Sequence, residues 1–170
     1  IGFSSSPGYD WYIGKATTSA GVGLFQIRDH GYNVRMSISE NGNVGIGRNP
    51  STYKLEVEGD IWAKGCIKPY QALTSATSVT MNVRSGQNAR ITLGHNVTLT
   101  LSNLADGDEG NIVITQDATG SRTLTVSPTP KVINGGGGAI VLTGTANSTD
   151  MISYTYTNSI LYITYGKNYS

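Results

Sequence analysis

Apolar and polar residues alternate with a period of two along most of the chain, and helical spacing is almost absent. Gly, Asn, Ser or Thr interrupts nearly every window long enough for an apolar helical stripe. Turn signals such as Asn41-Gly42-Asn43 and Asn49-Pro50 punctuate the N-terminal part. Between them the alternation places apolar pairs on one face of short strands: Phe25/Ile27, Met36/Ile38, Val44/Ile46 and Leu55/Val57. The pattern predicts β-hairpins over this part of the chain.

The alternation pauses around Gly65 to Gln71, where Lys68-Pro69 interrupts it. Beyond this point the apolar runs recur about every 8–12 residues, which is typical of a sandwich or small barrel. The expected strands contain Val79/Met81/Val83, Ile91/Leu93, Val97/Leu99/Leu101, Ile112/Ile114, Leu124/Val126, Ile140/Leu142, Ile152/Tyr154/Tyr156 and Ile160 to Tyr165. We therefore predict an all-β chain in which residues 1–67 form a short β-hairpin shaft or neck and residues 71–170 form a β-sandwich head, jelly-roll-like in topology.

Both predicted domains favour association with other copies of the chain. The outward positions of the second domain carry uncharged residues such as Thr98, Thr100 and Thr155 rather than the Lys or Glu that usually protect exposed strands. The short Gly-rich strands of the first domain bear too little apolar side chain to close a core within one chain. Three chains together supply enough. We expect a trimer whose shared core contains Val44, Ile46, Leu55, Val57 and Ile61.

Composition narrows the classes of function and partner. Of the 170 residues 14% are charged and the formal net charge is +1, which argues against nucleic acid as a partner. The single cysteine, Cys66, cannot form an intrachain disulfide. No apolar run approaches the roughly 18 residues of a membrane span, so we expect no membrane insertion. The chain starts without Met and in mid-pattern, so we expect it to be a fragment of a longer protein.

No arrangement of residues in the sequence predicts catalysis. The two histidines, His30 and His95, both lie in short Gly-containing segments typical of turns. The carboxylates show no pairing of the kind that glycoside cleavage requires. We expect no catalytic residues, no resident metal and no cofactor. A histidine repeated around a trimer axis stays open as an alternative metal site.

Polar loops are the expected points of contact with a receptor, because binding loops gather at the ends of a sandwich. Sugar rings also stack on aromatic side chains, and the available ones are Trp11, Trp62, Tyr70, Tyr154, Tyr156, Tyr162, Tyr165 and Tyr169. Tyr154 and Tyr156 alternate with Ile152 and are expected to pack in the core or between subunits. The candidate receptor- or glycan-binding residues are Asn103, Asp106, Asp108, Asp117, Arg122, Asn134 and Tyr162.

Residues 37–65 resemble a motif of bacteriophage tail-fibre and tail-spike proteins. The resemblance is carried by Asn43-Val44-Gly45-Ile46-Gly47 and by the run from Leu55 through Gly59-Asp60-Ile61-Trp62 to Gly65. Residues 1–36, with Trp11-Tyr12-Ile13-Gly14, look like the segment that precedes this motif. Residues 103–128 and the end of the chain look like a β-domain near the C-termini of phage virion proteins. The motif is often followed by a charged, helical, self-cleaving chaperone domain, and here a β-domain of low charge follows instead.

The resemblance implies a non-enzymatic, elongated homotrimer located on the virion, outside the cell. Its expected function is adhesion to the host bacterial surface, with a cell-surface glycan or protein receptor and other virion proteins as partners. Two alternatives stay open: a purely structural trimerisation, capping or capsid-decoration module, and a polysaccharide-degrading tail spike. A trimeric bacterial adhesin would share many of these features.

Overall fold

The computed structural model describes residues 2–4, 10–17, 23–65, 68–133 and 140–169. The chain divides into two compact units, Ile1–Gly65 and Cys66–Ser170. Apart from the short 3₁₀ helix η1 (Val83–Ser85), the regular structure of the described residues consists of β-strands, which confirms the predicted all-β class. The predicted division at residues 67–71 lies a few residues beyond the boundary between the units.

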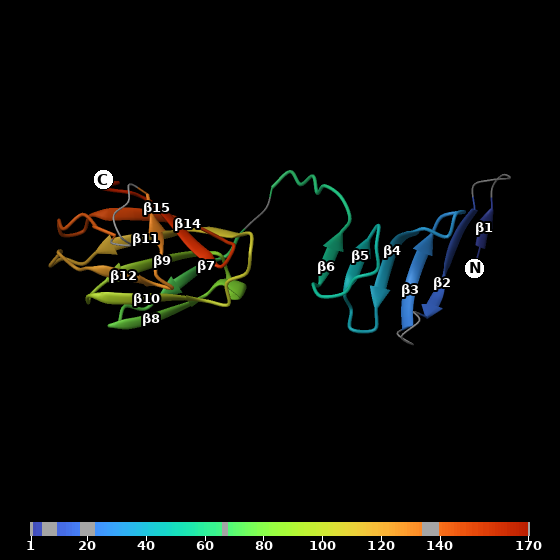
Figure 1. Ribbon diagram of the computed structural model, residues 1–170, viewed down its shortest axis with the longest axis horizontal. Helices are drawn as coiled ribbons and strands as arrows, with labels where there is room; N and C mark the ends of the chain where they lie inside the picture. The colour runs from blue at the N-terminus through green and yellow to red at the C-terminus, as the bar shows by residue number, and fades with distance from the viewer. Residues whose placement is uncertain (1, 5–9, 18–22, 66–67, 134–139, 170) are drawn as a thin grey trace. The chain divides into compact units, whose positions relative to one another are not determined.

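The first unit is one sheet whose six strands follow chain order (Figure 1). Neighbouring strands from β1 to β5 pair antiparallel, and β5 pairs parallel with β6. Gly42, at φ 73°, occupies the turn between β4 and β5, where its backbone N–H donates to the carbonyl of Ser39. Only glycine adopts that conformation without strain. The strands are β1 (Gly2–Ser4), β2 (Asp10–Thr17), β3 (Gly23–Arg28), β4 (Val34–Ser39), β5 (Val44–Ile46) and β6 (Leu55–Val57).

The second unit is a sandwich of a large and a small sheet (Figure 1). The small sheet has the order β12-β10-β8 and the large sheet the order β13-β15-β14-β11-β9-β7. The strands are β7 (Tyr70–Leu73), β8 (Ser78–Asn82), β9 (Asn88–Leu93), β10 (Val97–Ser102), β11 (Asp108–Gln116), β12 (Leu124–Ser127), β13 (Lys131–Val132), β14 (Thr149–Thr157) and β15 (Ile160–Gly166).

The connectivity of this sandwich differs from the jelly-roll-like topology expected from the sequence. Strands β7 to β12 alternate between the two sheets and run parallel to their neighbours within each sheet. Only β14 and β15 add an antiparallel hairpin beside β11. The chain therefore passes back and forth between the two sheets with parallel pairing, as in a short parallel β-helix, whereas a jelly roll is built from antiparallel strands. Alternation predicts where strands lie but not whether a three-residue connection such as 94–96 reverses the chain or carries it to the facing sheet.

Three segments also differ from the predicted strands. Val83, expected at the end of a strand with Val79 and Met81, instead begins the 3₁₀ helix η1. Ile140 makes a single antiparallel bridge with Leu124, and the predicted strand at Ile140 and Leu142 does not form. Tyr70, placed by the sequence in the pause between domains, instead begins β7 and pairs with Asn88. Whether Ile140 and Tyr70 belong to a strand thus depends on pairing with a neighbouring strand and not on local alternation.

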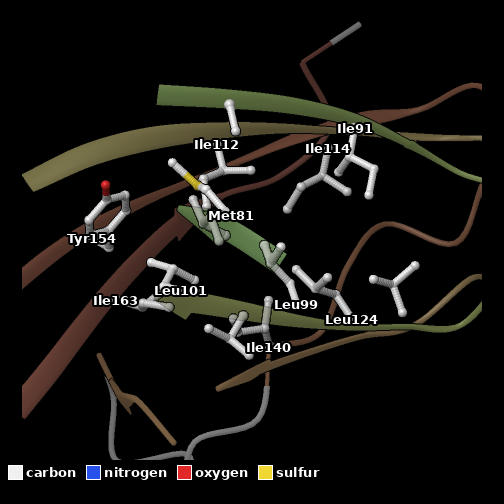
Figure 2. Packing of buried hydrophobic residues seen from close by; sticks show 14 of the residues in the cluster. Met81, Ile91, Leu99, Leu101, Ile112, Ile114, Leu124, Ile140, Tyr154 and Ile163 are labelled. Atoms are coloured by element: carbon white, nitrogen blue, oxygen red, sulfur yellow. The ribbon is translucent and has the colours of Figure 1, made fainter. Parts of the chain in front are cut away.

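The hydrophobic core of the second unit lies between its two sheets. Leu99 and Met81 of the small sheet and Ile112 of the large sheet are completely buried. Figure 2 shows side chains from both sheets meeting in this layer, among them Met81, Leu99, Leu101, Ile91, Ile112, Ile114, Tyr154 and Ile163. The alternating apolar positions of these strands point inward, as the sequence pattern predicts.

Tyr154 closes one end of this core. Its hydroxyl donates to the carbonyl of Gln87 at 2.8 Å. Burial, together with the nearby negative charge of Asp108, raises the pKa of Tyr154 to about 12. The phenol therefore stays neutral and keeps its hydrogen bond across the range of pH in which proteins fold.

Leu99→Ala is expected to lower the free energy of unfolding of the second unit by about 2–5 kcal/mol, because it leaves a cavity in a fully buried layer. Urea denaturation followed by far-ultraviolet circular dichroism measures the change. Thr98→Ala, at the exposed neighbouring position of β10, is the matched control and should change stability by less than about 1 kcal/mol. Equal effects of the two substitutions would contradict the assignment of the core.

Candidate functional site

The strand pairing of the first unit brings apolar side chains into two rows on one face of its sheet. Residues directly opposite each other in a sheet share a face, so paired positions line up across the strands. The two rows run across β3, β4, β5 and β6, and together they form what we call the apolar face: Phe25, Ile38, Val44 and Leu55 in one row, and Ile27, Met36, Ile46 and Val57 in the other.

The apolar face is open to solvent in the single chain. Phe25 is 45% exposed, Ile46 is 40% exposed and Leu55 is 58% exposed, and the other members are only half-buried. Contiguous exposed apolar surface of this kind marks an interaction site in a natural protein.

The opposite face of the same sheet is polar and is covered by the chain itself. Gln26, Ser37, Gly45 and Glu56 form one row across β3 to β6. Ser37 is completely buried, and its hydroxyl donates to the carbonyl of Arg48 at 2.8 Å. A Cβ at Gly45 would lie 2.2 Å from the same carbonyl, so the backbone approaches as closely as only glycine allows.

The segment 48–53, which we call the covering loop, is fastened to this polar row by several hydrogen bonds. The amide nitrogen of Gln26 donates to Asn49 Oδ1 at 2.5 Å. The carboxylate of Glu56 accepts from the backbone N–H groups of Ser51, Thr52 and Tyr53 at 2.6–2.9 Å. The Arg48 guanidinium lies 3.3 Å from the same carboxylate. Each polar side chain of the row therefore has a partner in the loop that covers it.

These bonds stabilise the ionised form of Glu56. The backbone N–H groups of Tyr53, Thr52 and Ser51, with a further contribution from Arg48, lower the pKa of Glu56 from 4.5 to about 2. The carboxylate of the folded unit is thus charged at any pH well above 2.

Four of the five residues predicted for a shared core lie on the apolar face: Val44, Ile46, Leu55 and Val57. Ile61 does not, because it follows the end of β6 and is 69% exposed outside the sheet. The predicted core omitted Phe25, Ile27, Met36 and Ile38, although their alternation is the same signal. Their register with β5 and β6 is what adds them to the face.

The predicted receptor-contact loops of the second unit lie at opposite ends of β11. The loop with Asn103 and Asp106 precedes this strand, and the loop with Asp117 and Arg122 follows it. The nine residues of β11 separate the two loops by roughly 27 Å, at about 3.3 Å per residue. They cannot contribute to one small-ligand site within a single chain.

Asp108 belongs to the internal structure of the first of these loops. It is 5% exposed, forms an ion pair with Arg84, and accepts from the backbone N–H of Ala105 at 2.7 Å. Burial alone would raise its pKa, but the bonds from Ala105 and Arg84 outweigh burial and lower the pKa. Asn103, at φ 59°, donates to Asn82 Oδ1. These contacts brace the turn, and they leave exposed Asp106 as the member of the loop available to a partner.

Asp117 and Arg122 do meet, within the second loop. Arg122 lies 2.9 Å from Asp117, whose other oxygen accepts from the backbone N–H groups of Thr119 and Gly120. Arg122 first, and then these backbone bonds, lower the pKa of Asp117. The pair closes the turn. Tyr162 is 40% exposed on β15, and Asn134 lies outside the described residues.

Among the described residues, no group of three or more His, Cys, Asp or Glu side chains is placed to hold a metal ion. No helix in the described part of the chain has the length and apolar character to cross a membrane. Comparisons with protein-family models, curated proteins and solved structures found no match to this chain.

Glu56→Gln is expected to reduce the stability of the first unit near neutral pH and to reduce its dependence on pH in acid. The folded-state pKa of about 2 lies below the unfolded value of about 4.5, so the carboxylate stabilises fully above pH 4.5 and this contribution disappears as the pH falls towards 2. Denaturation followed by the fluorescence of Trp11 and Trp62, both in this unit, measures the difference from the wild-type chain.

Glu58→Gln, at an exposed position beyond β6, is the matched control and should keep the wild-type pH dependence. A stability difference between Glu56→Gln and wild type that stays constant from pH 4.5 to pH 2 would contradict the assigned role of Glu56.

Proposed function

We propose that this chain is part of a non-enzymatic bacteriophage fibre protein. Three copies assemble through the apolar face of the first unit, and the second unit serves as a head that adheres to the host bacterium. Its partners are two further copies of itself, carbohydrate of the cell envelope and adjoining virion proteins, and its location is the virion. The observation that carries the proposal is the open apolar face, and the resemblance of residues 37–65 to tail-fibre proteins supports it.

The apolar face needs a second layer, because a sheet with one apolar side is stable only when that side is packed against another element. Other copies of the chain meet this need well. Each copy carries the same two rows, and from β3 to β6 these rows contain no charged side chain. The first row continues onto β2 as Lys15, opposite Phe25. Identical faces that pack through β3 to β6 therefore bury no unpaired charge.

The character of the second unit favours adhesion as the task of the head. The outward positions of its large sheet are mainly uncharged and polar, such as Asn111, Ser153 and Thr155. Hydroxyl and amide groups exchange hydrogen bonds readily with the hydroxyl groups of sugars.

Light scattering coupled to size-exclusion chromatography tests assembly. A mass three times the 18.0 kDa of one chain is expected. A labelled sample incubated with a panel of bacterial strains tests adhesion. A trimer that binds none of the strains would replace the adhesion proposal with the purely structural alternative, and a monomer would overturn the proposed assembly.

Ile46→Asp is expected to abolish the trimer, because it puts a charge at the centre of the apolar face. The mass in solution should fall to that of one chain. Val141→Asp places the same charge at a position of the second unit that is 60% exposed, and this matched control should remain trimeric. A trimer of normal stability in the Ile46→Asp variant would contradict the shared core.

A further inference from the structure

The outer face of the large sheet contains a polar hollow of about 270 Å³. A line of side chains crosses four neighbouring strands beneath it: Tyr70 of β7, Asn88 of β9, Asn111 of β11 and Ser153 of β14. Tyr70 pairs with Asn88, and Asn111 pairs with Ser153. These residues are far apart in the sequence, and only the pairing of the strands brings them together.

The hydrogen bonds among these side chains use the amide oxygens of the two asparagines but not their amide nitrogens. Asn88 Oδ1 accepts from the backbone N–H of Asn111 at 3.0 Å, and Asn111 Oδ1 accepts from the Ser153 hydroxyl at 2.7 Å. Both amide oxygens are thus occupied and the orientation of each amide group is defined. Asn88 is 6% exposed, yet its Nδ2 has no acceptor among the described residues, and neither has Nδ2 of Asn111.

A buried donor without an acceptor is unfavourable by about 1–3 kcal/mol, and Nδ2 of Asn88 is such a donor. Nδ2 of the half-buried Asn111 lies on the neighbouring strand, so the pair of donors suits a ligand with acceptor oxygens. The remaining groups around the hollow narrow the class of ligand. Tyr70 is 54% exposed at its edge and offers a ring on which an apolar C–H face can stack. Lys68 and Glu109 lie 3.4 Å apart on its border, and their charges cancel.

We propose that this hollow binds one residue of a neutral saccharide. Ring hydroxyl groups accept from the amide nitrogens of Asn88 and Asn111, and the ring stacks on Tyr70. The hollow is slightly smaller than the roughly 300–1,000 Å³ of sites for drug-sized molecules, which suits a single sugar ring within a longer glycan. This inference rests on the proposed adhesion to carbohydrate and names the place of contact, which lies on the sheet rather than in the loops.

Nuclear magnetic resonance titration of the full chain tests the site. The probes are the methyl glycosides of glucose, galactose and mannose, with methyl glucuronide as a charged counterpart. At least one neutral glycoside should shift the side-chain amide signals of Asn88 and Asn111 with a Kd on the order of 1 mM, and the glucuronide should bind more weakly.

Tyr70→Ala and Asn111→Asp are each expected to weaken binding by about tenfold or more. The aspartate keeps the oxygen that accepts from Ser153 and loses the donor. Tyr169→Ala is the matched control, because Tyr169 is 57% exposed and its backbone N–H donates to Thr149, at the far end of β14 from Thr155. It should bind like the wild type.

The proposed site is overturned if none of the three neutral glycosides shifts these amide signals, if the glucuronide binds most tightly, or if Tyr70→Ala binds as the wild type does. Adhesion to cells separates this failure from that of the proposed function. If the Tyr70→Ala chain binds bacteria as well as the wild type, the proposed site is wrong and the proposed adhesion stands. If the wild-type chain binds the glycosides in the hollow but binds no bacterium, the proposed site stands and the proposed adhesion is wrong.

Discussion

The bonds between the covering loop and the polar row of the first sheet are the constraint on which the rest of the first unit depends. Gln26, Ser37 and Glu56 each use their polar atoms to hold the loop, and Gly45 gives it room to lie against the sheet. Because a strand presents alternate residues to opposite faces, covering one face leaves the other open. The open face is the apolar one, and it is the face through which we propose that copies of the chain assemble.

Apolar and polar residues alternate along the strands of both units, but the two units bury opposite faces of their sheets. In the second unit the apolar positions face a second sheet of the same chain, and residues such as Leu99 and Ile112 are completely buried. In the first unit the polar positions receive the covering loop, while Ile46 and Leu55 remain exposed. The second unit therefore has its own core, whereas the first unit has a surface that resembles half of one. This contrast is the reason why the proposed function assigns assembly to the first unit and contact with the host to the second.

The sequence predicts the strands well because alternation is local, and it predicts poorly whatever depends on partners distant in the chain. Val44, Ile46, Leu55 and Val57 could be named in advance as one surface. The parallel winding of β7 to β12 could not, since a short connection is compatible with reversal or with crossing to the facing sheet. From the sequence, Asp108 is expected to be an exposed acidic residue of a loop, because its bonds to Arg84 and Ala105 depend on the fold. The hollow above Asn88 and Asn111 has no sequence signal, because strand register alone creates it.

Assembly and recognition support each other in the proposed function. A hollow of this size, whose charged lining residues Lys68 and Glu109 are paired with each other, gains few contacts from one sugar ring, so in the proposed function a single head binds its glycan weakly. Joining three heads through the first units makes the second and third binding events intramolecular, and avidity then rises by about 10²–10⁴ without any new contact. Weak single sites also let a fibre release one sugar and bind another on a crowded envelope. In the proposed function the open apolar face and the polar hollow are thus physically complementary, because assembly through the face supplies the several copies of the hollow that avidity requires.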